Sequence, residues 1–139
     1  DFTTRRVVVP DAVTSEPQTV VLTDTVGFIR ELPDTLMDAF RATLEEVTEA
    51  DALLHVVDLS HSGWQRQMES VIGILSEMTI ATGPALVVFN KIDQVAGEVL
   101  EVAKEKYPQS VFISASDRIG LETLRLRIGQ LLHYALAPK

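Results

Sequence analysis

The stretch ALVVFNKID, residues 85 to 93, places three polar residues directly behind an apolar run. The turn signal Gly83-Pro84 precedes the run, and five apolar residues in succession are typical of a buried strand. Asn90, Lys91 and Asp93 then stand at the carboxyl end of that strand. In open α/β sheets, ligands bind in the crevice beyond the carboxyl ends of the strands. The stretch therefore predicts a buried strand with a ligand site at its end.

The chemistry of these three side chains suits a guanine base. An aspartate such as Asp93 can accept hydrogen bonds from the N1–H and the exocyclic amine of guanine, a donor pair that adenine lacks. The Asn90 amide carries both a donor and an acceptor, so it can bind the purine edge or brace neighbouring loops. The aliphatic stem of Lys91 can cover the flat face of the base. The alternative, left open by this motif alone, is a helix start capped by Asn90 or Asp93.

Strands and helices alternate along the chain. The runs RRVVVP (5–10) and TVVLTD (19–24) predict an antiparallel hairpin. Further strands are predicted at 52–58, 85–89 and 110–114, the first of them covered on both faces. Apolar residues that recur every three or four positions predict four helices, with the second capped by Ser60 or Ser62. The inward-facing sets are Leu36, Phe40, Leu44 and Val47; Met68, Val71, Ile72 and Leu75; Val95, Val99 and Val102; and Leu121, Leu124, Ile128 and Leu131. This order predicts one α/β domain with a mostly parallel sheet and helices on both faces.

Composition excludes several classes of protein. The chain has 139 residues, 46% of them hydrophobic, which is typical of one globular domain with a real core. No apolar run approaches the ~20 residues that span a bilayer, and the N-terminal residues predict no secretory signal. Without cysteine there is no disulfide or thiolate metal site. The net charge is −8, and the carboxylates concentrated between Asp34 and Asp58 make direct contact with DNA or RNA there unfavourable.

Two weaker motifs also fall at the ends of predicted strands. In DTVG (24–27), the Asp24 carboxylate can hold Mg²⁺ through water, and Gly27 lets a backbone N–H approach a terminal phosphate. The SAS segment (114–116) closes the last predicted strand. Each of these is weak alone, but the order DTVG, NKID, SAS at successive strand ends indicates a nucleotide site.

These motifs carry a family resemblance. The segments TTRRVVVPD, LTDTVGFIRELP, AFRATLEEVTEADALLHVVDLS and VVFNKID resemble the HflX family of ribosome-associated GTPases, which is related to translation factors. The resemblance covers nearly the whole chain. It implies a P-loop GTPase-like three-layer sandwich, with a mostly parallel sheet and one antiparallel strand.

The resemblance also implies roles for individual residues. Asp24 and Gly27 would serve Mg²⁺ and the γ-phosphate, while Asn90, Lys91 and Asp93 would bind the guanine of GTP or GDP. Ser114 and Ala115 would support the base through backbone contacts, and residues 28 to about 45 would form the second switch segment. The intact protein would be cytoplasmic and would couple GTP hydrolysis to the large ribosomal subunit.

The second switch segment lacks a common catalytic group. Phe28 follows Gly27 where many small GTPases carry a glutamine that orients water. Phenylalanine cannot orient a water by hydrogen bonding, so catalysis would need a group from elsewhere. Arg30 is an alternative charge stabiliser within the chain, against a role on the surface or toward the ribosome.

The sequence contains no phosphate loop of the form G-x-x-x-x-G-K-[ST], since no lysine is followed by serine or threonine. The resemblance places that loop, its strand and its helix before Asp1, so residues 1–139 are predicted to be a partial GTP-binding domain, from just after the first switch to the last helix. We expect this chain alone to bind guanine nucleotide weakly, through the base, and to hydrolyse GTP negligibly. The alternative is a non-catalytic GTPase-like binding module; a nicotinamide dehydrogenase is a distant third, because no G-x-G-x-x-G is present.

Overall fold

The structure of the protein is a computed structural model, and residues 2–25, 51–77 and 84–136 are described. Its elements are β1 (Phe2–Pro10), β2 (Pro17–Thr25), β3 (Leu53–Asp58), α2 (Trp64–Glu77), β4 (Ala85–Asn90), the 3₁₀ turn η2 (Ile92–Gln94), α3 (Gly97–Lys106), β5 (Val111–Phe112) and α4 (Leu121–Leu136). The predicted strands and the last three predicted helices are confirmed in this order. The helix predicted around Leu36 to Val47 lies outside the described residues.

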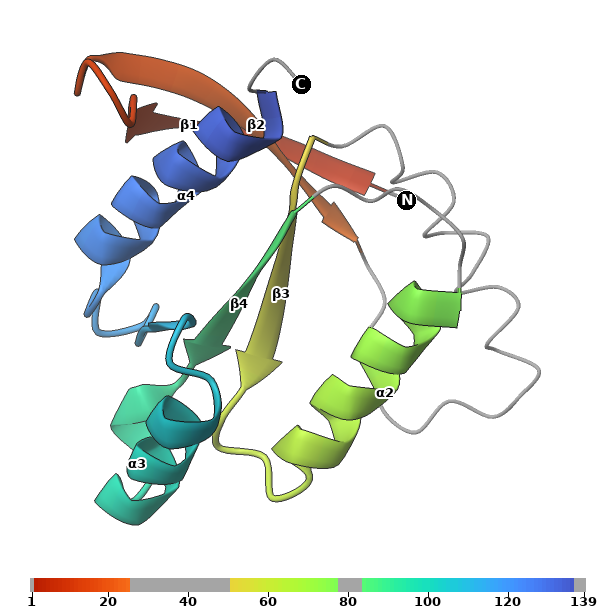
Figure 1. The fold of residues 1–139 in the computed structure, drawn as a ribbon. Coiled ribbons are helices and arrows are strands. Elements are labelled where there is room, and N and C mark those ends of the chain that lie inside the picture. Colours follow the sequence, from red (N-terminus) through yellow and green to blue (C-terminus); the bar gives the residue numbers. More distant parts are fainter. Residues whose placement is uncertain (1, 26–50, 78–83, 137–139) are drawn as a thin grey trace.

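The strands form two sheets (Figure 1). Strands β3, β4 and β5 pair in parallel, with Asp58 beside Asn90 at the ends of β3 and β4. Strands β1 and β2 form the predicted antiparallel hairpin, from Phe2 opposite Thr25 to Pro10 opposite Pro17. The α/β class is confirmed. Within the described residues, however, the hairpin is a sheet of its own, because no ladder joins β2 to β3.

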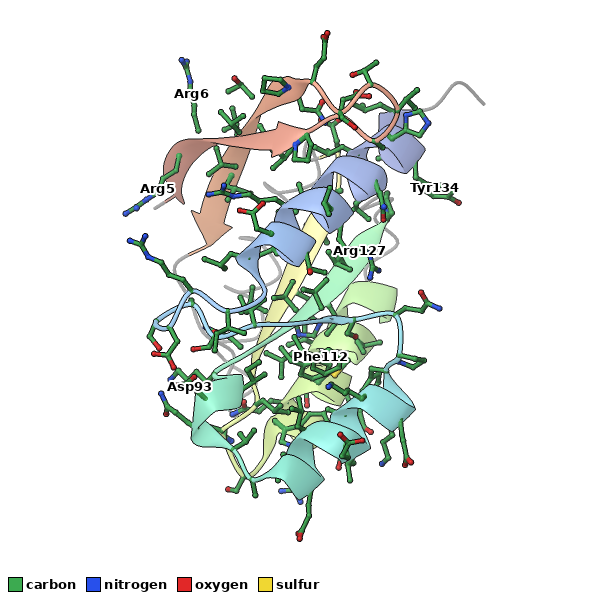
Figure 2. The ribbon with its side chains drawn as sticks, turned by 90° about the vertical axis from the view of Figure 1, so that its left-hand side faces the viewer. Arg5, Arg6, Asp93, Phe112, Arg127 and Tyr134 are labelled. Atoms are coloured by element: carbon green, nitrogen blue, oxygen red, sulfur yellow. The ribbon has the colours of Figure 1, made fainter. Side chains whose placement is uncertain are left out.

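One face of the parallel sheet packs against α2 and α3. The fully buried Phe89 is at the centre of this layer, where its ring lies 5.4 Å from Trp64, 5.8 Å from Tyr107 and 5.2 Å from Phe112. The buried members of the cluster are Val57, Leu59, Trp64, Met68, Phe89 and Ala103. Figure 2 shows Phe112 in the middle of these closely packed side chains. The aromatic cluster thus fixes the position of β4 immediately before Asn90.

The opposite face packs against α4. Leu86 and Val88 alternate along β4 with the residues of the first face, and they are buried with Val111 and Ile113. The predicted inward face of α4 is confirmed, with Ile128 buried and Leu121, Leu124 and Leu131 packed nearby. Helices on both faces of the sheet give the three layers expected of this class.

Three expectations about burial are wrong. Val56 of β3 is 52% exposed, because its partner Val88 faces α4, and α4 extends over β4 and β5 rather than over β3. Ile72 is 42% exposed, since the buried stripe of α2 runs through Trp64 and Met68. Val102 is also 42% exposed: α3 starts only at Gly97, so Val95 does not set its phase, and Ala103 is buried instead.

The start of α2 also differs from prediction. The residue before Trp64 is Gly63, so neither Ser60 nor Ser62 occupies the capping position directly before the helix. The Ser60 hydroxyl instead donates to Asp58 Oδ1 at 2.6 Å. None of the described helices is long and apolar enough to cross a membrane.

The hairpin is held against the rest of the protein by α4, which packs along β1 (Figure 1). Gly129 makes this approach possible: it is buried in α4, and a Cβ at this position would overlap the carbonyl oxygen of Pro10. A helical glycine costs about 1 kcal/mol relative to alanine. That cost is offset here by the close backbone contact between α4 and the end of β1.

Candidate functional site

The loops that follow β4 and β5 are joined by one side chain. Asn90 Oδ1 accepts a hydrogen bond from the Lys91 N–H at 2.8 Å and a second from the Ala115 N–H at 3.0 Å. The two donors are far apart in sequence, so this oxygen braces the end of β4 against the loop before α4. The residue that precedes η2 is Lys91, and it makes no side-chain capping bond. The structure therefore favours the bracing role of Asn90 over a helix cap.

The backbone at Lys91 is tightly constrained. Its φ of 67° and ψ of 33° lie in the left-handed region, which costs about 1–2 kcal/mol for a residue with a Cβ. Its neighbours are fixed on both sides: Asn90 O accepts from Leu59 N at 3.1 Å, and Ile92 N donates to Ile113 O at 3.2 Å. The strained turn is thus held by hydrogen bonds to the segments that follow β3 and β5.

The side chain of Lys91 reaches back toward β3. Its Nζ lies 3.1 Å from Asp58 Oδ2. The other carboxylate oxygen of Asp58 accepts from the Ser60 N–H at 2.9 Å and from the Ser60 hydroxyl at 2.6 Å. Partial burial would raise the pKa of Asp58, but the hydrogen bonds from Ser60 and Lys91 outweigh it and lower the pKa overall. Asp58 is therefore an anion that engages both neighbouring loops.

Ser114 and Ala115 belong to a closed loop. The Ser114 side chain is fully buried, and its Oγ accepts from the Asp117 N–H at 3.2 Å. The backbone of Ser114 exchanges two hydrogen bonds with Ile119, both at 3.0 Å. Gly120, at φ 79°, ends the loop where a Cβ would press on the carbonyl oxygen of Phe112. These bonds fix the position at which Ala115 meets Asn90.

The remaining candidates are placed differently. Asp93 is exposed on η2, at the edge of the molecule beyond β4 (Figure 2). Asp24 lies opposite Thr3 near the end of β2, in the two-stranded sheet. Gly27, Phe28 and Arg30 are outside the described residues. The structure thus brings together Asn90, Lys91, Ser114 and Ala115, with Asp93 beside them and Asp24 in the other sheet.

Sequence reasoning missed the part that Asp58 plays. It placed Asp58 at a strand end and gave it no function. The available signal was positional: in a parallel sheet, neighbouring strand ends lie at one edge, so Asp58 had to lie close to the NKID segment. The observed register, with Asp58 beside Asn90, is the one that allows the contact with Lys91.

The chain is similar to known GTPases. Residues 1–91 match the family model described as 50S ribosome-binding GTPase. A GTPase HflX from Magnetococcus marinus is 44% identical over 124 residues, which cover 89% of this chain and 28% of that protein. A GTPase HflX from Alkalihalophilus pseudofirmus is 37% identical over 138 residues, covering 99% of this chain and 31% of that protein.

This chain belongs to the HflX family of GTPases. Solved structures give the same fold. A crystal structure of an SsGBP variant, G235S, shares 34% identity at a TM-score of 0.65, over 94% of this chain and 47% of that one. Era, solved with MgGDPNP and part of 16S ribosomal RNA, has a TM-score of 0.57 and 22% identity, over 91% of this chain and 44% of that one. The chain spans less than a third of the length of these two HflX relatives.

Proposed function

We propose that residues 1–139 are part of a GTP-binding domain, and that their described portion forms its guanine site. The observation that carries this is the Asn90 brace, which holds Lys91 and Ala115 at one edge of the parallel sheet. With its oxygen engaged by the two loops, the Asn90 amide can offer its N–H donors to a purine. The exposed Asp93 carboxylate accepts from guanine's N1–H and amine, and the Lys91 stem covers one face of the base.

We propose Mg²⁺ and the γ-phosphate as the partners of Asp24 and Gly27, as in the family's motif. A carboxylate at a strand end suits a Mg²⁺ that keeps several of its waters. The sequence supplies no G-x-x-x-x-G-K-[ST] segment in these residues, so this chain contributes the base site and only part of the phosphate site. In the intact protein, GTP would be hydrolysed in the cytoplasm in association with the large ribosomal subunit.

A titration with a fluorescent guanine nucleotide, with and without Mg²⁺, tests the proposal. Weak binding of both GDP and GTP, nearly independent of Mg²⁺, is expected from a site that reads the base. Absence of guanine binding by a folded chain would contradict it.

The second candidate function is a GTPase-like module that binds a partner without turnover. Multiple-turnover hydrolysis measured on the intact protein distinguishes the two. Steady GTP turnover supports the enzyme, whereas guanine binding without turnover supports the module.

A further inference from the structure

We infer that Asp58, which lies outside the NKID motif, is a positioning residue that holds Lys91 in the orientation needed to cover the guanine base. The inference rests on the proposed guanine site and adds to it a residue from a different strand. Asp58 ends β3, whereas the motif follows β4, and the parallel register sets the two strand ends side by side.

The carboxylate of Asp58 is oriented before it meets the lysine. Both hydrogen bonds from Ser60 fall on Oδ1, at 2.9 and 2.6 Å, so Oδ2 is the oxygen presented toward β4. Lys91 Nζ lies 3.1 Å from that oxygen. Because the turn fixes one oxygen, it also sets the direction of the other, and the Asp58 side chain loses less conformational entropy when it pairs with Lys91.

The backbone of Lys91 is fixed independently of Asp58. The hydrogen bonds of Asn90 O and Ile92 N, together with the Asn90 side chain, hold the left-handed turn. What they leave undetermined is the direction of a flexible four-carbon stem. The 3.1 Å ion pair with Asp58 sets that direction, across the ends of β3 and β4. Asp58 thus acts on the ligand through Lys91 and needs no contact with the ligand itself.

Guanosine is the probe for the test, because an uncharged nucleoside does not respond to the net charge that an aspartate variant removes. Binding to the 139-residue chain is followed by NMR for wild type, Asp58→Asn, Lys91→Met and the double variant. We expect Asp58→Asn to weaken guanosine about two- to five-fold, the range of one partly exposed ion pair. In the Lys91→Met background the same change has no further effect. Glu105→Gln, an equal change of charge on the exposed face of α3, leaves binding unchanged.

A ligand-free measurement separates positioning from general loss of structure. We expect the two Lys91 Hε protons to have distinct chemical shifts in the wild type, and to merge in Asp58→Asn while the shifts of the α4 core stay in place. Ser60→Ala removes the hydroxyl bond to Oδ1 and keeps the charge of Asp58. It should weaken guanosine binding by less than Asp58→Asn does, and this loss should disappear when Lys91→Met is also present. The Ser60 variant therefore tests the inference even if Asp58→Asn does not fold.

Three results overturn the inference. Additive losses in the double variant mean that Asp58 acts independently of Lys91. Merged Hε shifts in the wild type mean that the ion pair with Asp58 does not order the Lys91 side chain. If guanosine does not bind the folded wild type at all, the proposed guanine site itself fails, and the positioning role fails with it.

Discussion

Replacing Asn90 with alanine removes the oxygen that joins the loops after β4 and β5. Two hydrogen bonds are lost, from the Lys91 and Ala115 N–H groups, and each is worth about 1 kcal/mol net. Both donors lie close enough to the surface for water to replace part of the loss, so we expect about 2 kcal/mol of destabilisation. For a chain of this length that corresponds to a fall in Tm of roughly 6–8 °C.

Trp64 provides the assay, because it is the chain's sole tryptophan and it packs on Phe89 directly ahead of Asn90. Urea and thermal unfolding are followed by its fluorescence. Asn90→Asp is the matched control: it keeps the accepting oxygens, so stability should fall by less than half as much, while the amide donors for guanine are lost. If Asn90→Ala lowers Tm by less than about 2 °C, roughly 0.5 kcal/mol, the oxygen is not a brace.

Three further predictions concern the fold. Gly129→Ala should destabilise the chain by about 1–3 kcal/mol, because the new Cβ overlaps the Pro10 carbonyl, and hydrogen-exchange protection should fall first in the β1–β2 hairpin. The control is Gly73→Ala on α2, where a Cβ meets nothing within 4 Å; it should stabilise the chain by up to about 1 kcal/mol. Burial lowers the pKa of His55 from 6.5, so on acidification the unfolded chain takes up this proton before the folded chain does. The free energy of unfolding should therefore be highest above pH 6.5 and should fall as the pH drops below it. His55→Gln should make this pH dependence weaker. Phe89→Ala should cost about 3–5 kcal/mol and remove cooperative Trp64 unfolding, whereas a native-like transition would mean that the aromatic cluster does not hold β4 in place.

The order of elements could be predicted because each carries a local signal. The run ALVVF is apolar on both faces, and the structure buries Leu86 and Val88 against α4 and Phe89 against α2 and α3. The leucines of α4 keep the period of a helix from its first residue, so its inward face was predicted correctly. The family resemblance fixed the class of fold in the same way, through motifs at strand ends.

Burial of individual side chains could not be predicted, because it depends on which element lies above them. Val56 belongs to an apolar run, yet α4 extends over β4 and β5 and leaves it exposed. Val102 matched the spacing from Val95, but the helix begins later and buries Ala103 instead. The contact between Asp58 and Lys91 is of the same kind, since it depends on strand register and on a left-handed turn.

The most direct test compares guanosine, inosine and adenosine as ligands of the wild-type chain and of Asp93→Ala. Inosine lacks only the exocyclic amine, so it can give the Asp93 carboxylate one hydrogen bond where guanosine gives two. A site of the proposed kind binds guanosine more tightly than inosine and binds adenosine least, and Asp93→Ala removes the difference between guanosine and inosine. Equal affinity for all three nucleosides, or a guanosine preference that survives Asp93→Ala, would contradict a guanine site at this edge of the sheet.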